Sequence, residues 1–145
     1  MVITSKDNEA IKKIRKLKEK KYRDTDSKYI VEGIKLVREA IVEDASIDTI
    51  VVCDDCIKKG EIDQKVLYEI AKYNCMYVDQ KVLGSITDVK NPQGILAVVD
   101  KKNSNDDIKY DEDVIVVLDD IQDPGNLGTL LRTLDSVRTY TGNSI

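Results

Sequence analysis

A polar loop near the C-terminal end of the sequence holds the residues whose types and spacing best suit chemistry. This stretch, DDIQDPGNLGTLLRT at 119–133, follows the continuous apolar run Val114–Leu118. Such a run is typical of a strand in a parallel sheet covered on both faces, and leucines at helical spacing come after it. Open α/β sheets bind ligands where a parallel strand leads into a helix. We therefore select Asn126, expected at the helix start, and Arg132, expected on its second turn, as candidate catalytic residues.

The loop also resembles the first signature motif of a known enzyme family. Its pattern D-P-G-N-x-G-x-x-x-R-T is similar to that of the SpoU/TrmH-type RNA ribose methyltransferases, which belong to the knotted SPOUT superfamily. Two upstream matches follow the order of that family: Tyr22-Arg23 with Tyr29–Gly33, then Thr87-Asp88 with Asn91–Val99. The resemblance spans roughly residues 10 to 137, and three motifs in order make it specific.

The resemblance implies methyl transfer from S-adenosylmethionine to a ribose 2′-hydroxyl of ribosomal or transfer RNA, with catalytic roles for Asn126 and Arg132. An arginine is a poor general base, because its pKa exceeds about 12. We therefore expect Arg132 to hold a phosphate and to stabilise a developing alkoxide. From the residues alone, an N-cap explains Asn126 and an exposed helix position explains Arg132 equally well.

The cofactor site is expected to be absent from this chain. In the resembled family, second and third signature motifs build the knot that holds S-adenosylmethionine, and neither follows Arg132 here. Residues 138–145 do not continue the family pattern, so we expect a member truncated after its first motif. Such a chain alone would bind no S-adenosylmethionine and would be inactive. Its single strand and helix cannot bury the strand's two faces, which predicts association or a homo-oligomer.

The charge distribution predicts where RNA would bind. The window Lys12–Arg23 has eight basic residues and one acid, a net charge of +7, although the whole chain has −4. Clustered cations bind phosphates because they release condensed counterions. Charge alone selects Lys12, Arg15 and Lys16, while the resemblance adds Arg23 and Gln93 as RNA-binding residues. A solvated helix face is the alternative explanation of the basic window.

The order of apolar segments predicts an α/β fold. We expect an N-terminal α/β/α substrate-binding domain over residues 1–102, a linker over 103–113, and the first βα unit of an α/β knot methyltransferase domain over 114–145. The first domain resembles a fold shared with some ribosomal proteins that bind kinked RNA. Its expected helices are Lys6–Lys20, Ile34–Glu43, Val66–Tyr73 and Gln80–Ile86, and its expected strands are Lys28–Glu32, Thr49–Cys53, Met76–Val78 and Gly94–Val99.

Composition excludes several classes of protein. No apolar run approaches the roughly 18 residues of a membrane span. Three cysteines, an odd count, suit a reducing cytoplasm rather than a disulfide framework. Cys53 and Cys56 have C-x-x-C spacing, but with no histidine and only one further cysteine they lack the four ligands of a structural zinc site. We expect no metal and structural cysteines.

Three interpretations follow from these observations. The first is an RNA ribose 2′-O-methyltransferase represented by its RNA-binding part, with ribosomal RNA favoured over transfer RNA. The second is a non-catalytic RNA-binding module. The third is an interaction fragment that associates through its exposed βα unit.

Overall fold

The computed structural model describes residues 1–101 and 116–140. They belong to two compact units, Met1–Ser104 and Asn105–Ile145, which are described separately below. The predicted linker at 103–113 lies outside the described residues. The predicted domain boundaries therefore stay predictions.

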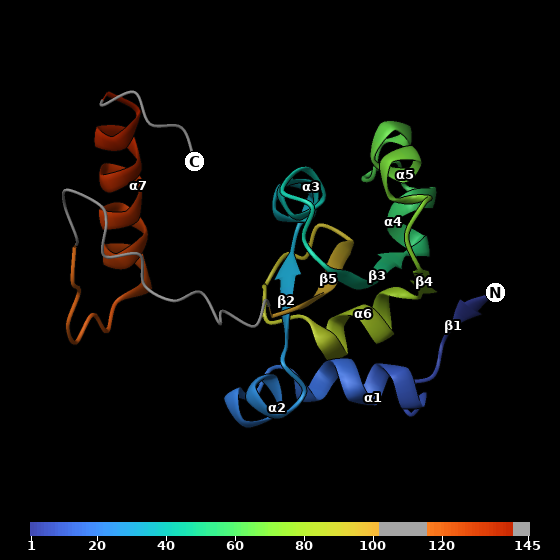
Figure 1. Cartoon of the computed structure of the whole chain (residues 1–145). Coiled ribbons are helices and arrows are strands. Elements are labelled where there is room, and N and C mark those ends of the chain that lie inside the picture. The colour runs from blue at the N-terminus through green and yellow to red at the C-terminus, as the bar shows by residue number, and fades with distance from the viewer. Residues whose placement is uncertain (102–115, 141–145) are drawn as a thin grey trace. The chain divides into compact units, whose positions relative to one another are not determined.

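A five-stranded mixed sheet forms the centre of the first unit (Figure 1). Its spatial order is β1-β4-β3-β5-β2. Neighbouring strands pair in parallel from β1 to β3 and antiparallel from β3 to β2. The strands are β1 (Val2–Ile3), β2 (Lys28–Glu32), β3 (Ile47–Cys53), β4 (Cys75–Val78) and β5 (Ile95–Asp100).

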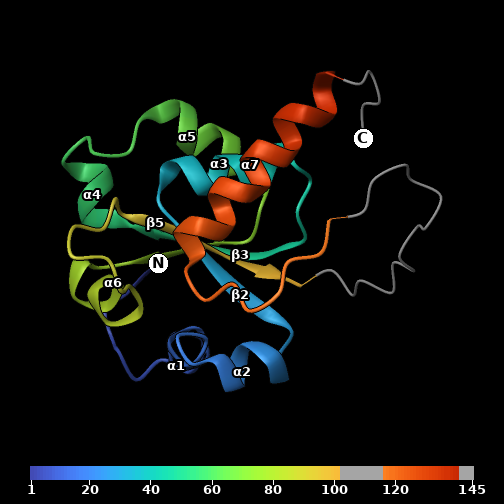
Figure 2. The same cartoon turned by 90° about the vertical axis from the view of Figure 1, so that its left-hand side faces the viewer.

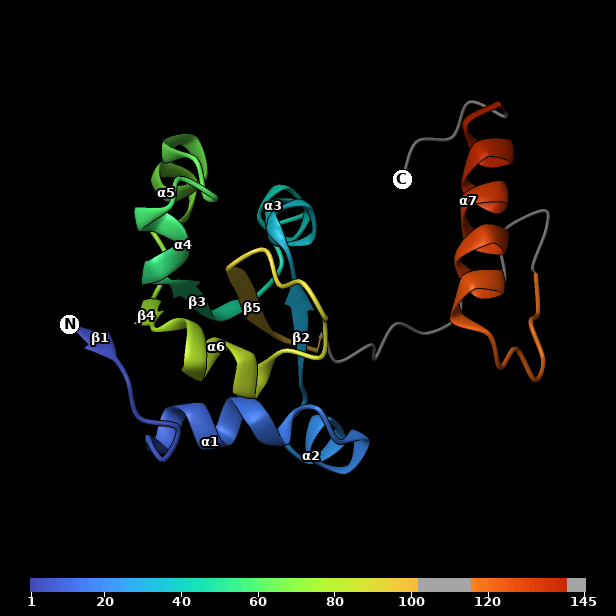
Figure 3. The same cartoon turned by 180° about the vertical axis from the view of Figure 1, so that it is seen from behind.

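Helices cover both faces of this sheet, as Figures 1 and 3 show from opposite sides. On one face lie α1 (Glu9–Lys16), α2 (Lys20–Thr25) and α6 (Gln80–Ile86). On the other lie α3 (Ile34–Val42) and α5 (Gln64–Ile70), and the short α4 (Asp54–Lys58) follows β3. Arg38 joins α3 to α5 through two hydrogen bonds to the Glu69 carboxylate, of 2.8 and 2.9 Å.

The core is aliphatic and lies against the two central strands. Val51 and Val52 on β3, and Leu96 and Ala97 on β5, are all fully buried. Because neighbouring residues of a strand point to opposite faces, this burial shows that both faces of the sheet are covered. Ile11, Ile14 and Leu17, spaced by three residues, lie on one side of this segment and pack it onto the core.

Most predicted elements of the first unit are confirmed. β2 and α6 have the predicted bounds, and α3, α5, β3, β4 and β5 differ by a few residues at their ends. The predicted helix Lys6–Lys20 is wrong in extent. Asn8 caps its start through hydrogen bonds from the amides of Ala10 and Ile11. After Lys16 the chain turns, with the amides of Lys18 and Glu19 bonding three residues back, and a second helix starts at Lys20.

The prediction missed two short elements. α4 has five residues and β1 has two, so neither is long enough to show a helical or alternating period. β1 is a strand because it pairs in parallel with β4 at a distant point in the sequence. Tertiary pairing, rather than local pattern, therefore decides this edge of the sheet.

In the second unit, the described part is an extended segment followed by helix α7 (Pro124–Tyr140), which Figure 2 shows in red. The predicted helix is confirmed. The predicted strand Val114–Leu118 is wrong for residues 116–118, which are not paired in a strand, and positions 114 and 115 lie outside the described residues. A strand forms only with a hydrogen-bonded neighbour, and the described part of this unit offers none. Within the described residues, no helix combines the length and apolar character needed to cross a membrane.

Gly94 provides a test of how tightly the β5 end is packed. Its φ is +79°, and a Cβ atom there would lie 2.7 Å from the Cβ of Cys56. We expect Gly94→Ala to lower the free energy of unfolding by roughly 3 kcal/mol, because backbone strain and overlap with Cys56 both act against the fold. Urea unfolding followed by circular dichroism measures this loss.

Gly60→Ala is the matched control. Gly60 has a similar φ of +72°, but nothing lies within 4 Å of its added Cβ. Its expected loss is ~1 kcal/mol from backbone strain alone. Equal losses in the two variants would contradict the close packing of Gly94 on Cys56.

Candidate functional site

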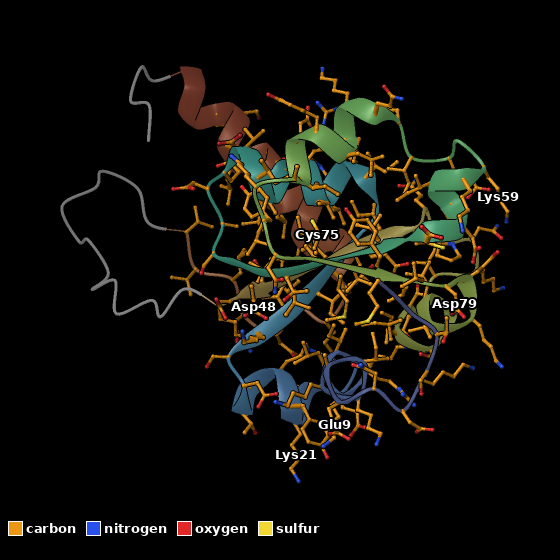
Figure 4. The ribbon with its side chains drawn as sticks, turned by 90° about the vertical axis from the view of Figure 1, so that its right-hand side faces the viewer. Glu9, Lys21, Asp48, Lys59, Cys75 and Asp79 are labelled. Atoms are coloured by element: carbon orange, nitrogen blue, oxygen red, sulfur yellow. The ribbon has the colours of Figure 1, made fainter. Side chains whose placement is uncertain are left out.

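Four lysines on α1 and α2 form an exposed cationic surface, which we call the basic face: Lys13, Lys16, Lys20 and Lys21. Figure 4 shows Lys21 projecting away from the sheet at the outer side of α2. None of the four forms a salt bridge within the described part of the chain. The predicted RNA-binding residue Lys12, in contrast, pairs with Glu9 at 3.1 Å, and this pair is solvated on the outer side of α1.

Two other predicted residues contribute differently to this surface. Lys16 lies over the ring of Tyr22, 5.3 Å from its centroid, and Lys21 lies 5.9 Å from the same centroid. Tyr22 is half-buried and its ring lies near both ammonium groups, so it is not hidden under α1. Arg15 turns away from this group, because its guanidinium donates to the backbone carbonyl of Lys6. Lys16 is thus well placed for a phosphate contact and Arg15 is partly occupied.

Arg23 has a structural contact and spare donors. Its Nη1 donates to the carbonyls of Leu17 at 3.0 Å and Lys18 at 2.5 Å, where α1 has just ended. The carbonyls at a helix C-terminus lack intrahelical partners and carry partial negative charge, so a guanidinium there stabilises the turn between α1 and α2. Its Nε and Nη2 atoms have no hydrogen bond to the described residues.

Gln93 acts as a cap for α3. Its Oε1 accepts a hydrogen bond of 2.9 Å from the amide of Ile34, the first residue of the helix. Gly33, at the N-cap position, has no side chain to do this, and its φ of +97° suits glycine. A Cβ on Gly33 would lie 2.9 Å from the Gln93 Oε1. The Glu32-Gly33 and Gln93-Gly94 segments are therefore held together at the start of α3.

A second cross-connection fixes the side chain of Glu32. The Thr87 hydroxyl donates to the Glu32 carboxylate, while the Thr87 carbonyl accepts from Lys18 Nζ at 2.7 Å. Lys18 also pairs with Asp88 at 3.0 Å. Residues from α1, β2 and the segment after α6 are thereby brought to one place, although up to 69 positions separate them in sequence.

These contacts border a half-open pocket of about 300 Å³. It lies between the α1–α2 corner, the end of α6 and the edge strand β2. Its lining mixes aliphatic side chains with both charges: Leu17, Lys18, Arg23, Tyr29, Ile30, Glu32, Ile86 and Asp88. Positive and negative groups on one small apolar base suit a ligand with both hydrogen-bond donors and acceptors.

In the second unit, Asp123 rather than Asn126 caps the helix. The Asp123 Oδ1 accepts from the amide of Gly125 at 2.7 Å, and Pro124 occupies the first helical position. The expectation that Asn126 marks the helix start is therefore wrong, and Asn126 is exposed inside the first turn. The helix starts two residues before Asn126 because proline suits the first helical position, where the backbone amide has no partner within the helix.

The helix does not bring Asn126 and Arg132 together. Six residues of helix separate them by about 9 Å along the axis and place them on different faces. Arg132 is exposed, and its Nη2 makes one long hydrogen bond, 3.4 Å, to Thr129. If both residues act in catalysis, they cannot contact the same atom from this helix alone, and each would need its own partner groups.

The cysteines have structural surroundings. Cys53 ends β3 and Cys56 lies in α4; both are buried and free. Burial, together with hydrogen bonds involving Cys53 and Glu61, raises the pKa of the Cys56 thiol to about 12. Such a thiol is protonated at neutral pH and is a poor nucleophile or metal ligand. Residues 1–101 and 116–140 contain no cluster of three acidic, cysteine or histidine side chains suited to a metal ion.

Comparison with known proteins identifies the first unit. The family described as "MRM3-like substrate binding domain" matches residues 8–97. The chain belongs to this family. The match runs from the N-cap of α1 to the middle of β5 and includes the basic face and the pocket. The resemblance to SpoU/TrmH-type methyltransferases is confirmed at the level of the family.

The relatives carry the family domain within longer proteins. The 23S rRNA (guanosine(2553)-2′-O)-methyltransferase RlmP of Bacillus subtilis is 28% identical over 134 residues, which are 92% of this chain and 50% of that protein. A crystal structure of an RNA 2′-O ribose methyltransferase has a TM-score of 0.68 and 25% identity, covering 94% of this chain and 52% of that chain. An AdoMet-bound rRNA methyltransferase from Sinorhizobium meliloti has a TM-score of 0.56 and 28% identity, covering 70% and 37%. The chain thus spans about half the length of RlmP.

Sequence reasoning missed several residues of the pocket in this family member. Lys18 stands inside the basic run and was not distinguished from its neighbours, while Tyr29, Glu32 and Asp88 were motif residues without an assigned role. The two upstream motifs were the available signal, because each contributes residues to the lining of the same pocket. Only the fold shows that these segments meet.

Replacing Gln93 tests its capping role. We expect Gln93→Ala to lower the free energy of unfolding by about 0.5–1 kcal/mol, because the α3 N-terminus loses its acceptor. Gln93→Glu keeps an acceptor at the same place and should retain stability. Chemical unfolding midpoints of both variants give the comparison. An unchanged unfolding midpoint for Gln93→Ala would contradict the capping role of Gln93.

Proposed function

We propose that the chain is the RNA-recognition part of an S-adenosylmethionine-dependent RNA methyltransferase. The observation that carries the proposal is that the family match at residues 8–97 falls on the unit that presents the basic face and the adjoining pocket. A substrate-binding domain of such an enzyme must hold a polyanion, and unpaired lysines on neighbouring helices supply the required charge. The negative net charge of the whole chain does not contradict this proposal, because a phosphate responds to the electrostatic potential of the surface that it approaches.

We further propose that the reaction of the whole enzyme is methyl transfer to a ribose 2′-hydroxyl, with ribosomal RNA as the substrate. RlmP is a 23S rRNA (guanosine(2553)-2′-O)-methyltransferase and the solved structure is of an RNA 2′-O ribose methyltransferase, so the activities of these relatives support this chemistry. In that reaction, Arg132 would stabilise charge on the nucleotide, and Asn126 would shape the site. Both are exposed on α7 and available to such a role.

S-adenosylmethionine does not fit the described residues of the second unit. A small-molecule site buries most of its ligand's surface. Between residues 116 and 137, however, every residue is exposed except Leu127 and Gly128, which are half-buried. We therefore propose that this chain alone binds no S-adenosylmethionine and is inactive alone, and we derive no step through the cofactor.

Association of the second unit is a further candidate property. Val117, Leu131 and Val137 are 81%, 53% and 60% exposed, which leaves several large apolar side chains in contact with water. Burying such surface is favourable by about 25 cal/mol per Å². We propose that another protein surface covers these side chains. A second copy of this chain is one such partner.

The basic face gives a direct test of RNA binding. We expect the double variant Lys16→Gln/Lys21→Gln to bind single-stranded RNA more weakly, and the slope of log K against log salt to fall by about 1.4, because two phosphate contacts are lost. Fluorescence anisotropy of a labelled ribosomal RNA fragment at several salt concentrations measures both quantities.

Lys65→Gln/Lys72→Gln is the matched control, with the same change in charge in α5 and just after its end. Lys72 lies 5.2 Å from the Tyr73 ring centroid and so resembles Lys16 over Tyr22, but α5 lies on the other face of the sheet. We expect this control to bind RNA nearly as the unaltered chain does. Equal losses for both doubles would mean that binding follows net charge, and RNA binding through the basic face would be wrong.

Titration of S-adenosylmethionine into the chain tests the cofactor proposal. We expect no heat of binding in calorimetry at millimolar cofactor, because the described part of the second unit encloses no ligand. Micromolar binding would contradict the proposal and would direct attention to Asn126 and Arg132.

A further inference from the structure

We infer that the pocket beside β2 is a base-reading subsite that takes an unpaired guanine of the RNA. The inference rests on the proposed RNA-binding function and adds the identity of one recognised base. It concerns recognition by this domain and is independent of which nucleotide is methylated. Its evidence is the arrangement of Glu32, Lys18 and Arg23 around one small cavity.

Glu32 is the central group of this arrangement. It is half-buried, and one carboxylate oxygen is held by the Thr87 hydroxyl. Within the described part of the chain it forms no salt bridge, and its second oxygen has no hydrogen-bond donor. This oxygen is not one of the buried polar atoms that lack a partner, so water reaches it in the free protein. A ligand that displaces this water must itself donate hydrogen bonds there, because a carboxylate oxygen removed from water without a donor is unfavourable.

Cationic groups lie on the same pocket wall as this acceptor. Lys18 Nζ uses two of its three donors on the Thr87 carbonyl and Asp88. Arg23 uses Nη1 on the end of α1 and retains Nη2 and Nε. Both side chains are anchored by these contacts, so binding a further acceptor would cost little side-chain entropy.

Guanine matches this combination better than the other bases. Its Watson–Crick edge places two donors, N1–H and N2–H, next to one acceptor, O6. A carboxylate accepts from the two donors together, and a lysine or arginine donates to O6. Uracil offers a single donor between two acceptors, and adenine offers one donor and one acceptor. The pocket's apolar lining, with Tyr29 at one side, supplies contact for the face of the base.

The pocket also has a suitable size and position. About 300 Å³ is at the lower end of small-molecule sites, so it suits a single base. It is half-open and shares Lys18 and Arg23 with the α1–α2 segment that carries the basic face. Phosphates held by Lys16 and Lys21 would keep the strand close to the pocket, so that an unstacked base can enter.

Binding of short single-stranded RNAs tests the inference. The probes are labelled uridine oligomers with one central guanosine, inosine, adenosine or cytidine, measured by fluorescence anisotropy with the 145-residue chain. We expect guanosine to bind at least about fivefold more tightly than adenosine or cytidine. Inosine, which lacks the N2 amino group, should lie between them.

The variant Glu32→Gln separates base reading from charge. Removing a negative charge strengthens binding to every phosphate chain, so affinity for the adenosine probe should rise slightly while the guanosine preference is lost. Glu43→Gln, an exposed carboxylate at the end of α3, makes the same charge change and should keep the preference. Asp88→Asn, at a 77% exposed side chain, gives a second pocket variant that does not remove the Glu32–Thr87 contact; it should reduce the preference by loosening Lys18.

Each outcome bears on one of the two claims. RNA binding of equal strength for all four probes would overturn the guanine subsite and leave RNA recognition in place. Absence of binding to every probe and to the ribosomal fragment would overturn the proposed function and the subsite together. Free guanosine monophosphate is the last probe. If it displaced the oligomer at an equal concentration, the pocket would be a site for a free nucleotide, and base reading within RNA would be wrong.

Discussion

The interlocked end of β2 is the constraint on which the recognition surface depends. The amide of Gly33 donates to the carbonyl of Ile95 at 2.9 Å, and the amide of Ile34 donates to Gln93. These bonds close the gap between β2 and the start of β5. Glycine is favoured at position 33 because its φ is +97°, and a Cβ there would also lie 2.9 Å from the Gln93 Oε1 and displace this cap. The start of α3 and the direction of Glu32 follow from this close approach.

The segment after α6 extends the same constraint to the pocket. Thr87 is bonded on one side to Glu32 and on the other to Lys18, so it links the edge strand to the end of α1. Arg23 then holds the turn that leads into α2. Each of these side chains has a structural contact and also faces the pocket or its rim. Stability and recognition therefore share residues here, because a group must be fixed before it can discriminate between ligands.

Some lysines of the first unit form salt bridges that hold the fold, and others keep their charge exposed to solvent. Lys28 pairs with Asp48 and Asp100, each at 3.0 Å, where β2, β3 and β5 meet. The hydrogen bond from Lys28, followed by that from Ser46, holds the pKa of Asp100 below its usual value. Exposed pairs of this kind contribute little stability, about 0–1 kcal/mol. The lysines of the basic face form no salt bridge with the residues that the structure describes, which leaves their charge available to a polyanion.

The sequence by itself determined the periodic elements and the order of the motifs. Ile11, Ile14 and Leu17 revealed the buried side of α1, and the apolar runs revealed β3 and β5, because burial on one or both faces leaves a repeating pattern. It also located the cationic stretch and the family resemblance. It failed for β1, for the break after Lys16 and for residues 116–118, whose structure depends on which backbone groups find a partner.

Only the tertiary structure decided what the selected residues do. Gln93 and Arg23 were predicted to bind RNA, and the fold uses both to satisfy helix ends, which are local needs invisible in a list of residue types. Lys18, Glu32 and Asp88 gained their significance because chain folding brings α1, β2 and the segment after α6 together. A sequence records side-chain chemistry along one dimension. Which donors and acceptors remain free is fixed only when the packed chain has used the others.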